Sequence, residues 1–430
     1  MAIYHKKIAI ISVVLIALIP ESALARDIIV HAGHLIDGYS NAERDIVSIV
    51  IHDDRIVSIQ PGFIEAPGAE IIDLSHETVL PGLIDCHDHL TYGLDTPIVW
   101  QFTTRTPYDE LMSGVANARK TLMAGFTSVR DVGGYTPVVI ALKKAIATGK
   151  VDGPRLWVSG GIIGPSGGHG DMRNGFDPML TKPEWVEGVV DSPYDAIRVV
   201  RERHMMGADL IKIAPSGGIS TDSDDPDAQL MTDDEIKAVV DAAHTLHMKV
   251  AAHAHGRQAI EHASKLGVDS IEHGTLADEG SYKIMKANGT WLVPTLSVGA
   301  VETELARTRP ELFSRSAVAK VLQIAPLMSR NLSNAYKAGV KIAFGTDTGI
   351  SPHGQNAREF NLLVKAGVTP MDAIKSATSA AAELIGDPQD IGSVQPGHYA
   401  DLIATKNNPL DDITELERVS FVMKGGVRFK

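Results

Sequence analysis

The sequence predicts an α/β protein, a (β/α)8 TIM-type barrel joined to a small β-sandwich domain that is built from both ends of the chain. Short apolar strand patterns alternate with helical segments, which is typical of βα units around a parallel sheet. From His87 to Asp347 this alternation covers about 260 residues, which matches a barrel better than an open doubly wound sheet. Both ends of the chain instead carry short β patterns separated by turn residues.

Length and composition are those of an ordinary globular protein. The chain has 430 residues, of which 44% are hydrophobic and 22% charged, with 39 glycines and 22 prolines. These values exclude disordered, collagen-like and low-complexity proteins. The formal net charge is −13 and the sequence has no long basic run, so nucleic acids and anionic membrane surfaces are not expected partners.

The first 25 residues read as a secretory signal peptide. Lys6 and Lys7 precede an apolar run over 8–19, and the small-residue triplet at 23–25 provides a cleavage site. This apolar run is shorter than the roughly 20 residues that cross a bilayer. We therefore expect a secreted or periplasmic protein that is cleaved near Ala25 and has no stable membrane association.

The composite β-sandwich domain is expected over residues 26–80 and 390–430, as an antiparallel sheet. Turn signals at 53–54 and 61–62 separate its first strands, and Gly425-Gly426 is expected to close a last hairpin. The expected strands lie at 27–35, 45–52, 55–60, 70–74, 400–405 and 419–423.

The barrel domain is expected over residues 81–389. Helices with 3.6-residue periodicity separate its strands, and one of them begins after the cap-like Thr232 while another ends before Gly267. No Gly-x-Gly-x-x-Gly motif follows the first strand, which argues against a dinucleotide-binding sheet. The eight expected strands lie at 83–89, 126–131, 156–160, 210–214, 249–253, 270–273, 291–295 and 341–347.

The first barrel strand ends in a His-x-His pattern. His87 and His89 are two residues apart on a strand, so both imidazoles point to the same side. The pattern alone is a weak signal for metal binding. The position of the pattern strengthens this signal, because the active sites of such barrels form at the carboxyl ends of the strands.

Four other strand ends carry groups of a related kind. Lys212 ends the fourth strand, His253 the fifth, His273 the sixth and Asp347 the eighth. Taken singly, each has an ordinary structural explanation, such as a rim histidine or a turn-forming aspartate. Together, such residues at five strand ends indicate a site for zinc or another first-row divalent ion.

At these residues the chain resembles the amidohydrolase superfamily. The resemblance covers essentially the whole mature chain, from the segment 81–89 that leads into the barrel to the segment 397–402 that returns to the β domain. It implies two divalent ions, with zinc the expected metal, and a lysine that is carbamylated by carbon dioxide or bicarbonate. On this basis one ion is held by His87, His89 and Asp347, the other by His253 and His273, and carbamylated Lys212 bridges both.

The expected catalytic residues are Lys212 and Asp347. Carbamylation requires an uncharged amine, and burial beside cations lowers the pKa of a lysine. Asp347 is expected to accept a proton from the attacking water and to pass it to the leaving amine, first as general base and then as general acid.

Within the superfamily the chain is most similar to the Xaa-Pro dipeptidase-like amidohydrolases, which include metallocarboxypeptidases and ochratoxin-hydrolysing amidases. The segments that carry this likeness are 130–134, 167–171, 212–218 and 253–256. It implies release of a C-terminal amino acid from a small or dipeptide-like substrate with a free carboxylate, for example an N-acyl amino acid such as ochratoxin A. It also implies a homo-oligomer, with an octamer as one form.

Three further histidines are candidates for substrate binding. His169 lies in a glycine-rich loop that can close over a substrate or be a plain surface turn. His255 shares the strand face of His253, where it lines the pocket or supports a ligand from behind. His353 follows Asp347 closely and either faces the pocket or does not.

Other activities of the same superfamily compete with amide cleavage. A mononuclear deaminase or a hydrolase of cyclic amides, such as imidazolones or lactams, uses similar His-x-His and Asp positions. Deaminases generally lack a bridging lysine, so Lys212 favours hydrolysis of a linear amide. A non-enzymatic scaffold of this fold would typically have lost metal ligands, whereas all six are present here.

Overall fold

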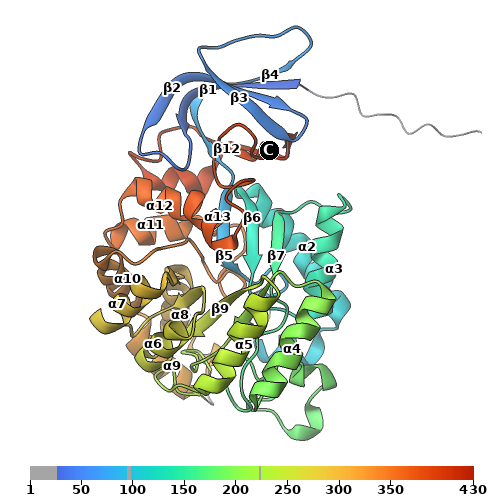
Figure 1. Ribbon diagram of the computed structural model, residues 1–430, viewed down its shortest axis with the longest axis vertical. Coiled ribbons are helices and arrows are strands. Elements are labelled where there is room, and N and C mark those ends of the chain that lie inside the picture. Colours follow the sequence, from blue (N-terminus) through green and yellow to red (C-terminus); the bar gives the residue numbers. More distant parts are fainter. Residues whose placement is uncertain (1–26, 94–97, 222–223) are drawn as a thin grey trace, which may run out of the picture.

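The structure is a computed structural model that describes residues 27–93, 98–221 and 224–430. The expected signal peptide lies outside these residues. Figure 1 shows a β-sheet at one end of the molecule and an array of strands and helices that makes up the rest. Within the described part of the chain, no helix is long and apolar enough to cross a membrane.

Strands from both ends of the chain form one seven-stranded sheet, in the order β14-β13-β12-β4-β1-β2-β3. Alternate apolar side chains of this sheet, among them Ile28, Val30 and Ile49, are buried in a core of their own. Gly425 and Gly426, both with positive φ, form the turn between the last two strands, as predicted. The strands are β1 (Asp27–Ile36), β2 (Glu43–His52), β3 (Arg55–Pro61), β4 (Glu70–Pro81), β12 (Leu402–Thr405), β13 (Phe421–Lys424) and β14 (Val427–Arg428).

This sheet differs from the prediction in two respects. It is mixed, because β4 pairs in parallel with β1 and antiparallel with β12. In addition, β4 continues seven residues beyond its expected end at Leu74, because its last four residues pair with β12. The structure assigns these strands to a single sheet, so the sandwich stays a prediction.

Parallel strands form two further sheets, with the orders β5-β6-β7 and β11-β10-β9-β8. They correspond to seven of the eight predicted barrel strands. Only Gly82 separates β4 from the first of them, so the composite sheet leads directly into the parallel strands. The parallel strands are β5 (Leu83–Asp88), β6 (Phe126–Asp131), β7 (Arg155–Val158), β8 (Leu210–Ile213), β9 (Lys249–Ala254), β10 (Ser270–His273) and β11 (Trp291–Val293).

The eighth predicted strand, 341–347, is not a regular strand. It forms isolated contacts instead: the Ala343 N–H donates to the Leu292 carbonyl at 3.0 Å, and the Cys86 N–H donates to the Phe344 carbonyl at 2.9 Å. The segment therefore lies between β11 and β5. Gly345 lies so close to β11 and β5 that a Cβ at this position would be 2.9 Å from the Cβ of His87. A larger residue that favours strands would therefore not fit at position 345.

The helices alternate with the parallel strands (Figure 1). Helix α5 begins after Thr232, whose side chain forms a capping box with Glu235, and α6 ends before Gly267, as predicted. The helices are α1 (Ile98–Thr104), α2 (Pro107–Met123), α3 (Thr136–Ala147), α4 (Pro193–Met206), α5 (Asp233–Thr245), α6 (Arg257–Lys265), α7 (Glu279–Asn288), α8 (Leu296–Thr308), α9 (Arg315–Ile324), α10 (Leu327–Ala338), α11 (Arg358–Lys365), α12 (Pro370–Ser376) and α13 (Ser379–Ile385).

Candidate active site

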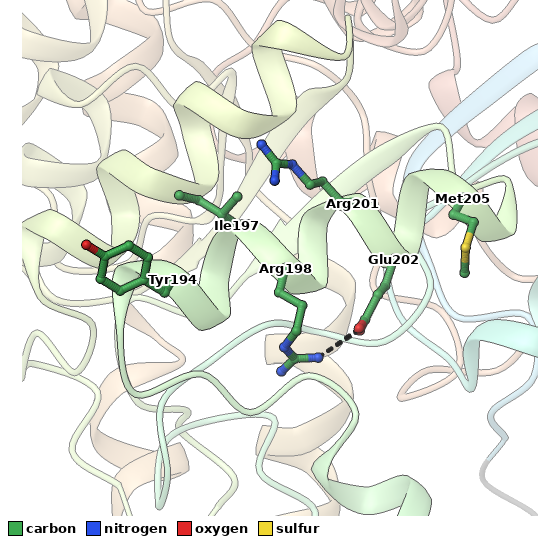
Figure 2. Close-up of a pocket in the computed structure, with 6 residues that line it drawn as sticks. All are labelled: Tyr194, Ile197, Arg198, Arg201, Glu202 and Met205. Atoms are coloured by element: carbon green, nitrogen blue, oxygen red, sulfur yellow. Dashed lines mark hydrogen bonds and ion pairs between the residues drawn. The ribbon is translucent and has the colours of Figure 1, made fainter.

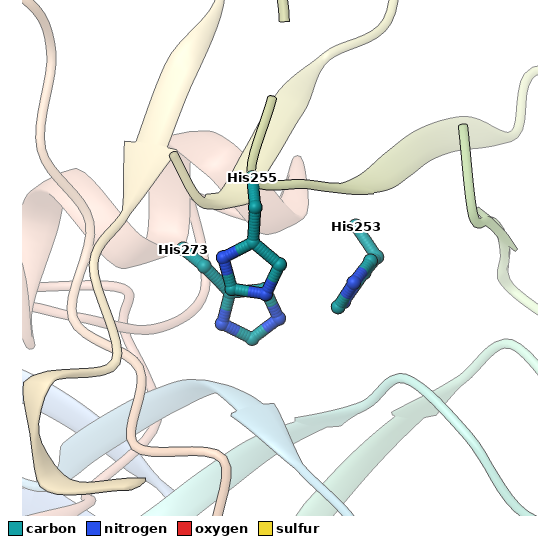
Figure 3. Close-up of side chains that lie close together, drawn as sticks. All are labelled: His253, His255 and His273. Carbon is teal, nitrogen blue, oxygen red and sulfur yellow. The ribbon is translucent and has the colours of Figure 1, made fainter. Parts of the chain in front are cut away.

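The structure brings the predicted metal ligands together at the carboxyl ends of the parallel strands. One nitrogen or oxygen of His87, His273 and Asp347 lies within 4.8 Å of the others, and the same holds for His253, His255 and His273. Figure 3 shows the second group, in which the rings of His255 and His273 stack and that of His253 stands across them. His273 belongs to both groups, so the two form one continuous centre.

Two of the imidazoles are held by their Nδ1 atoms. Nδ1 of His87 lies 2.7 Å from Oε2 of Glu272, and Nδ1 of His89 lies 3.1 Å from the Gly133 carbonyl. Because a carboxylate and a carbonyl can only accept, both Nδ1 atoms carry the proton. The Nε2 lone pairs are therefore left for a metal ion.

The other two imidazoles are oriented by a hydroxyl and a carbonyl. Nδ1 of His273 lies 2.7 Å from Oγ1 of Thr295. His253 is held the opposite way, with its Nε2 3.3 Å from the Gly217 carbonyl, so that its Nδ1 lone pair remains. Each of the four predicted histidine ligands thus has one nitrogen held by a residue outside the predicted ligand set, which leaves the other nitrogen for the ligand cluster.

Burial keeps three of these imidazoles uncharged, whereas at His89 burial is outweighed by the neighbouring Asp347, which raises the pKa of that ring. Burial lowers the pKa of His87 to about 4 and the pKa values of His253 and His273 well below the ordinary value. Neutral imidazoles are the form that binds metal ions, and together with a carboxylate they make a donor set typical of zinc and other first-row metals. The residues fit a divalent metal site.

Asp347 faces the same centre from the loop that follows segment 341–346. Its Oδ1 lies 3.1 Å from Nε2 of His89 and 3.6 Å from Nε2 of His87. Burial alone would raise the pKa of Asp347, but the neighbouring His87 and His89 hold it below its usual range. Its φ of 56° lies in the left-handed region, which Asp tolerates better than most residues. Asp347 is thus a buried carboxylate beside two imidazoles.

Lys212 reaches the centre from β8. Its side chain is buried, and its Nζ donates to Nε2 of His87 at 3.4 Å. Burial lowers the pKa of Lys212 to about 8, so a part of the amine is uncharged near neutral pH. This is the form that can react with carbon dioxide.

Sequence reasoning missed the buried ion pair behind His87. Glu272 contacts Arg130 at 2.8 Å as well as His87, and Arg130 also donates to the Ser270 hydroxyl at 3.1 Å. Burial raises the pKa of Glu272, but Arg130 and His87 outweigh it and lower that pKa to about 2. The signal that could have revealed the pair is a carboxylate next to a predicted ligand inside an apolar strand, with an arginine in another strand.

We expect Glu272→Gln to weaken both the fold and the metal site. The substitution leaves the Arg130 charge buried without its partner, which costs about 3–5 kcal/mol of unfolding free energy. An amide has only one acceptor oxygen for the two donors Arg130 and His87, so His87 faces an NH2 group or Arg130 does. Where the NH2 group faces His87, the ring loses the acceptor that orients it, and metal affinity should fall by about 10- to 100-fold. Denaturant unfolding and metal titration measure the two effects. The control is Glu279→Gln on α7, where the exposed glutamate pairs with Lys283; equal effects of both variants would contradict the assignment.

The three predicted substrate histidines lie in different places. The ring of His169 stacks on that of His253 at 4.0 Å between centroids, with its Nδ1 3.4 Å from Asp224. Nδ1 of His255 lies 2.8 Å from Oγ1 of Thr275. Both histidines therefore contact the predicted ligands or lie in their cluster.

His353 packs instead against the segment that follows β5. Its side chain is buried, its Nε2 lies 2.9 Å from the Tyr92 carbonyl, and its Nδ1 lies 3.8 Å from Asp88. Burial lowers the pKa of His353 to about 4, so this imidazole is neutral. The side chain of His353 therefore supports the chain segment at the end of β5.

Two surface hollows lie outside the set of predicted ligands. Figure 2 shows the first, of about 450 Å³, on the outer face of α4, where Arg198 and Glu202 form an ion pair. The second, of about 670 Å³, lies between α7 and α10. Neither hollow is lined by a predicted ligand.

Comparison with known proteins agrees with this geometry. Residues 78–428 match the Amidohydrolase family. A crystal structure of a Xaa-Pro dipeptidase with bound methionine in its active site has a TM-score of 0.90 and 39% identity, covering 94% of this chain and 100% of that one. A prolidase complexed with N-methylphosphonate-L-proline has a TM-score of 0.87 and 32% identity, covering 94% and 99%.

A fungal relative extends the comparison. Ochratoxinase from Aspergillus niger is 33% identical over an alignment of 430 positions that covers 94% of this chain and 87% of that protein. Its crystal structure superposes with a TM-score of 0.83. The family match and these relatives imply a TIM-barrel-type fold that accompanies the composite sheet. The chain belongs to the amidohydrolase family and is a hydrolase that acts on amide bonds.

Proposed function

We propose that this enzyme is a binuclear metallohydrolase that releases a C-terminal amino acid from dipeptides or N-acyl amino acids. The observation that carries the proposal is the buried lysine amine that meets His87 at 3.4 Å, beside Asp347 and the other imidazoles. The names of the relatives, a Xaa-Pro dipeptidase, a prolidase and an ochratoxinase, support the amide-cleaving activity and the position of the bond.

In the proposed site, the six predicted residues hold two divalent ions, with zinc the expected metal. His87, His89 and Asp347 would hold one ion, His253 and His273 the other, and carbamylated Lys212 would contact both. Divalent ions in such a site lower the pKa of water and polarise the scissile carbonyl. We also propose that the two parallel sheets close into one barrel through segment 341–347, whose contacts with β11 and β5 support closure.

Asp347 is the residue proposed to move the proton. Its carboxylate is ionised, because His87 and His89 hold its pKa down, and it can therefore accept a proton from the attacking water. The same oxygen can then give the proton to the amine nitrogen as the C–N bond breaks. The products are a carboxylic acid and an amino acid with a free amine.

His169 and His255 are proposed to recognise the substrate's terminal carboxylate. They are the two imidazoles beside the predicted ligands that the proposed metal set does not use. Imidazole N–H groups can donate hydrogen bonds to a carboxylate, and hydrogen bonds to an ionised group are about twice as strong as neutral ones. The carboxylate would thus fix the position of the scissile amide.

Masking the substrate's carboxylate tests the proposed function. We expect N-propionyl-phenylalanine to be cleaved, and its primary amide to react with kcat/KM lower by about 10² or more, because buried donors would be left unpaired. Initial rates of phenylalanine or phenylalaninamide release measure the ratio. Equal hydrolysis of the acid and the amide would contradict C-terminal specificity and favour an endo-acting amidase or a hydrolase of cyclic amides.

A further inference from the structure

Thr295, the residue directly before helix α8, has a backbone conformation that its residue type rarely adopts. Its φ of 49° and ψ of 46° lie in the left-handed region, where a β-branched residue is an outlier. The residue is fully buried. Such outliers persist only where the surrounding structure holds them, and they are concentrated at functional sites. The contacts of Thr295 therefore indicate which role the conformation serves.

Thr295 occupies the N-cap position of α8 but does not cap the helix. Thr106, Thr232 and Thr369 precede α2, α5 and α12, and each has a negative φ and accepts a hydrogen bond from a backbone N–H of the first turn. This is the usual N-cap arrangement. The side chain of Thr295 makes no such bond to the first turn of α8, all of whose residues the structure describes. The conformation of Thr295 therefore does not serve the helix.

A glutamate from another helix caps α8 instead. Glu359, in the first turn of α11, accepts hydrogen bonds from the N–H groups of Leu296 at 2.8 Å and Ser297 at 2.6 Å. It also accepts one from the Ser297 hydroxyl at 2.6 Å. The first N–H groups of α8 are thus satisfied without Thr295, whose hydroxyl is left for another partner.

That partner is the predicted ligand His273. Oγ1 of Thr295 lies 2.7 Å from Nδ1 of His273. Thr295 follows β11, which pairs with β10, the strand that ends at His273, so the contact joins two neighbouring strand ends. A hydroxyl can accept the Nδ1 proton, and Nε2 is then the nitrogen with the unshared electron pair. The left-handed conformation of Thr295 thus accompanies a contact with a predicted metal ligand.

His273 is the predicted ligand whose orientation affects the centre most widely. Among the described residues, it alone belongs to both buried groups of possible metal ligands, one with His87 and Asp347 and the other with His253 and His255. Between centroids, its ring lies 4.7 Å from the ring of His253 and 4.9 Å from that of His255 (Figure 3). A rotation of the His273 ring would therefore change the geometry of both groups.

We propose that Thr295 is a positioning residue for metal binding: its left-handed backbone directs the hydroxyl to His273, and Glu359 caps α8 in its place. The inference rests on the proposed function, because it requires that His273 binds an ion. A partner that holds the second nitrogen of a ligand imidazole typically contributes about 10- to 100-fold to metal affinity. An ordinary N-cap threonine would instead stabilise its helix.

Substitutions of Thr295 separate these two roles. Thr295→Val keeps the shape and the branched side chain but removes the hydroxyl, so we expect zinc affinity to fall by about 10- to 100-fold. Thr295→Ser keeps the hydroxyl and loses only a methyl group, so its zinc affinity should stay close to that of the wild type. Thr295→Ala also lacks the hydroxyl and adds no atom, so it should show the same loss as Thr295→Val and serves if that variant does not fold. Titration of the metal-free proteins with zinc against a competing chelator measures the affinity, and circular dichroism checks the fold.

The matched control is Thr232→Val, at a threonine that does cap its helix. This variant should lower the midpoint of urea unfolding and leave zinc affinity unchanged. Wild-type zinc affinity in the folded variants that lack the Thr295 hydroxyl, or an equal loss of affinity in Thr295→Ser, would overturn the inference and leave the proposed function intact. Failure of the wild-type protein to bind zinc would instead contradict the proposed metal site itself.

Discussion

Lys212→Ala is expected to reduce amide hydrolysis to background. The variant loses the only group proposed to contact both ions, and the neighbouring His87 cannot replace a bridging anion. Metal ions contribute several kcal/mol of charge stabilisation to such transition states, and each 1.4 kcal/mol is tenfold in rate, so kcat should fall by at least about 10³. Steady-state hydrolysis of N-propionyl-phenylalanine in bicarbonate buffer measures the loss.

Chemical rescue separates the carbamate role from simple misfolding. A small carboxylic acid such as acetate or propionate can occupy the space of the missing side chain, and we expect it to restore part of the activity of Lys212→Ala but not to stimulate the wild-type enzyme. The control is Lys237→Ala, an exposed lysine on α5 that pairs with Asp241. Near-normal turnover and metal content in Lys212→Ala would show that the carbamate role is wrong.

Asp347→Asn should lower kcat by about 10² to 10⁴, the usual range for general acid/base catalysis. An amide has nearly the same shape as the carboxylate, and Asn also tolerates the left-handed backbone that residue 347 adopts, so the fold should survive. Substrate binding should change little, because the amide loses the proton transfer and weakens only one metal contact. Steady-state kinetics on metal-saturated enzyme gives kcat and KM separately.

Asp241→Asn provides the control for this loss, because Asp241 is an exposed aspartate that pairs with Lys237 and lies on the outer helix α5. It should leave both constants unchanged. A rise in KM with an unchanged kcat in Asp347→Asn would assign the residue to substrate binding and contradict its role in proton transfer.

Much of the parallel-strand architecture could be predicted from the sequence because each strand is short, apolar and bounded by turn or helix signals. Seven of the eight strands lie where the pattern placed them. Segment 341–347 has the same apolar pattern, but Gly345 and the positive φ of Asp347 prevent a regular ladder there. The long course of β4 was missed because its pairing with β12 joins residues far apart in the chain, which no local pattern reveals.

The clustering of the predicted metal ligands could be foreseen because the strand ends of a βα array meet at one rim. The residues that orient these ligands were harder to predict from the sequence. Glu272 and Arg130 meet across two different strands, a contact that no local sequence pattern indicates. Such contacts depend on how the elements pack, and this is why His353, so close in sequence to Asp347, packs against Tyr92 and Asp88 instead of joining the ligand cluster.

The most direct test of the account is the number of metal ions per chain. Elemental analysis of the wild-type enzyme, loaded with zinc in bicarbonate and freed of excess metal, should give two ions per chain, and Lys212→Ala treated in the same way should give fewer. Chelation should abolish hydrolysis of N-propionyl-phenylalanine, and added zinc should restore it. A wild-type content that stays at one ion per chain under saturating zinc and bicarbonate would contradict the binuclear site.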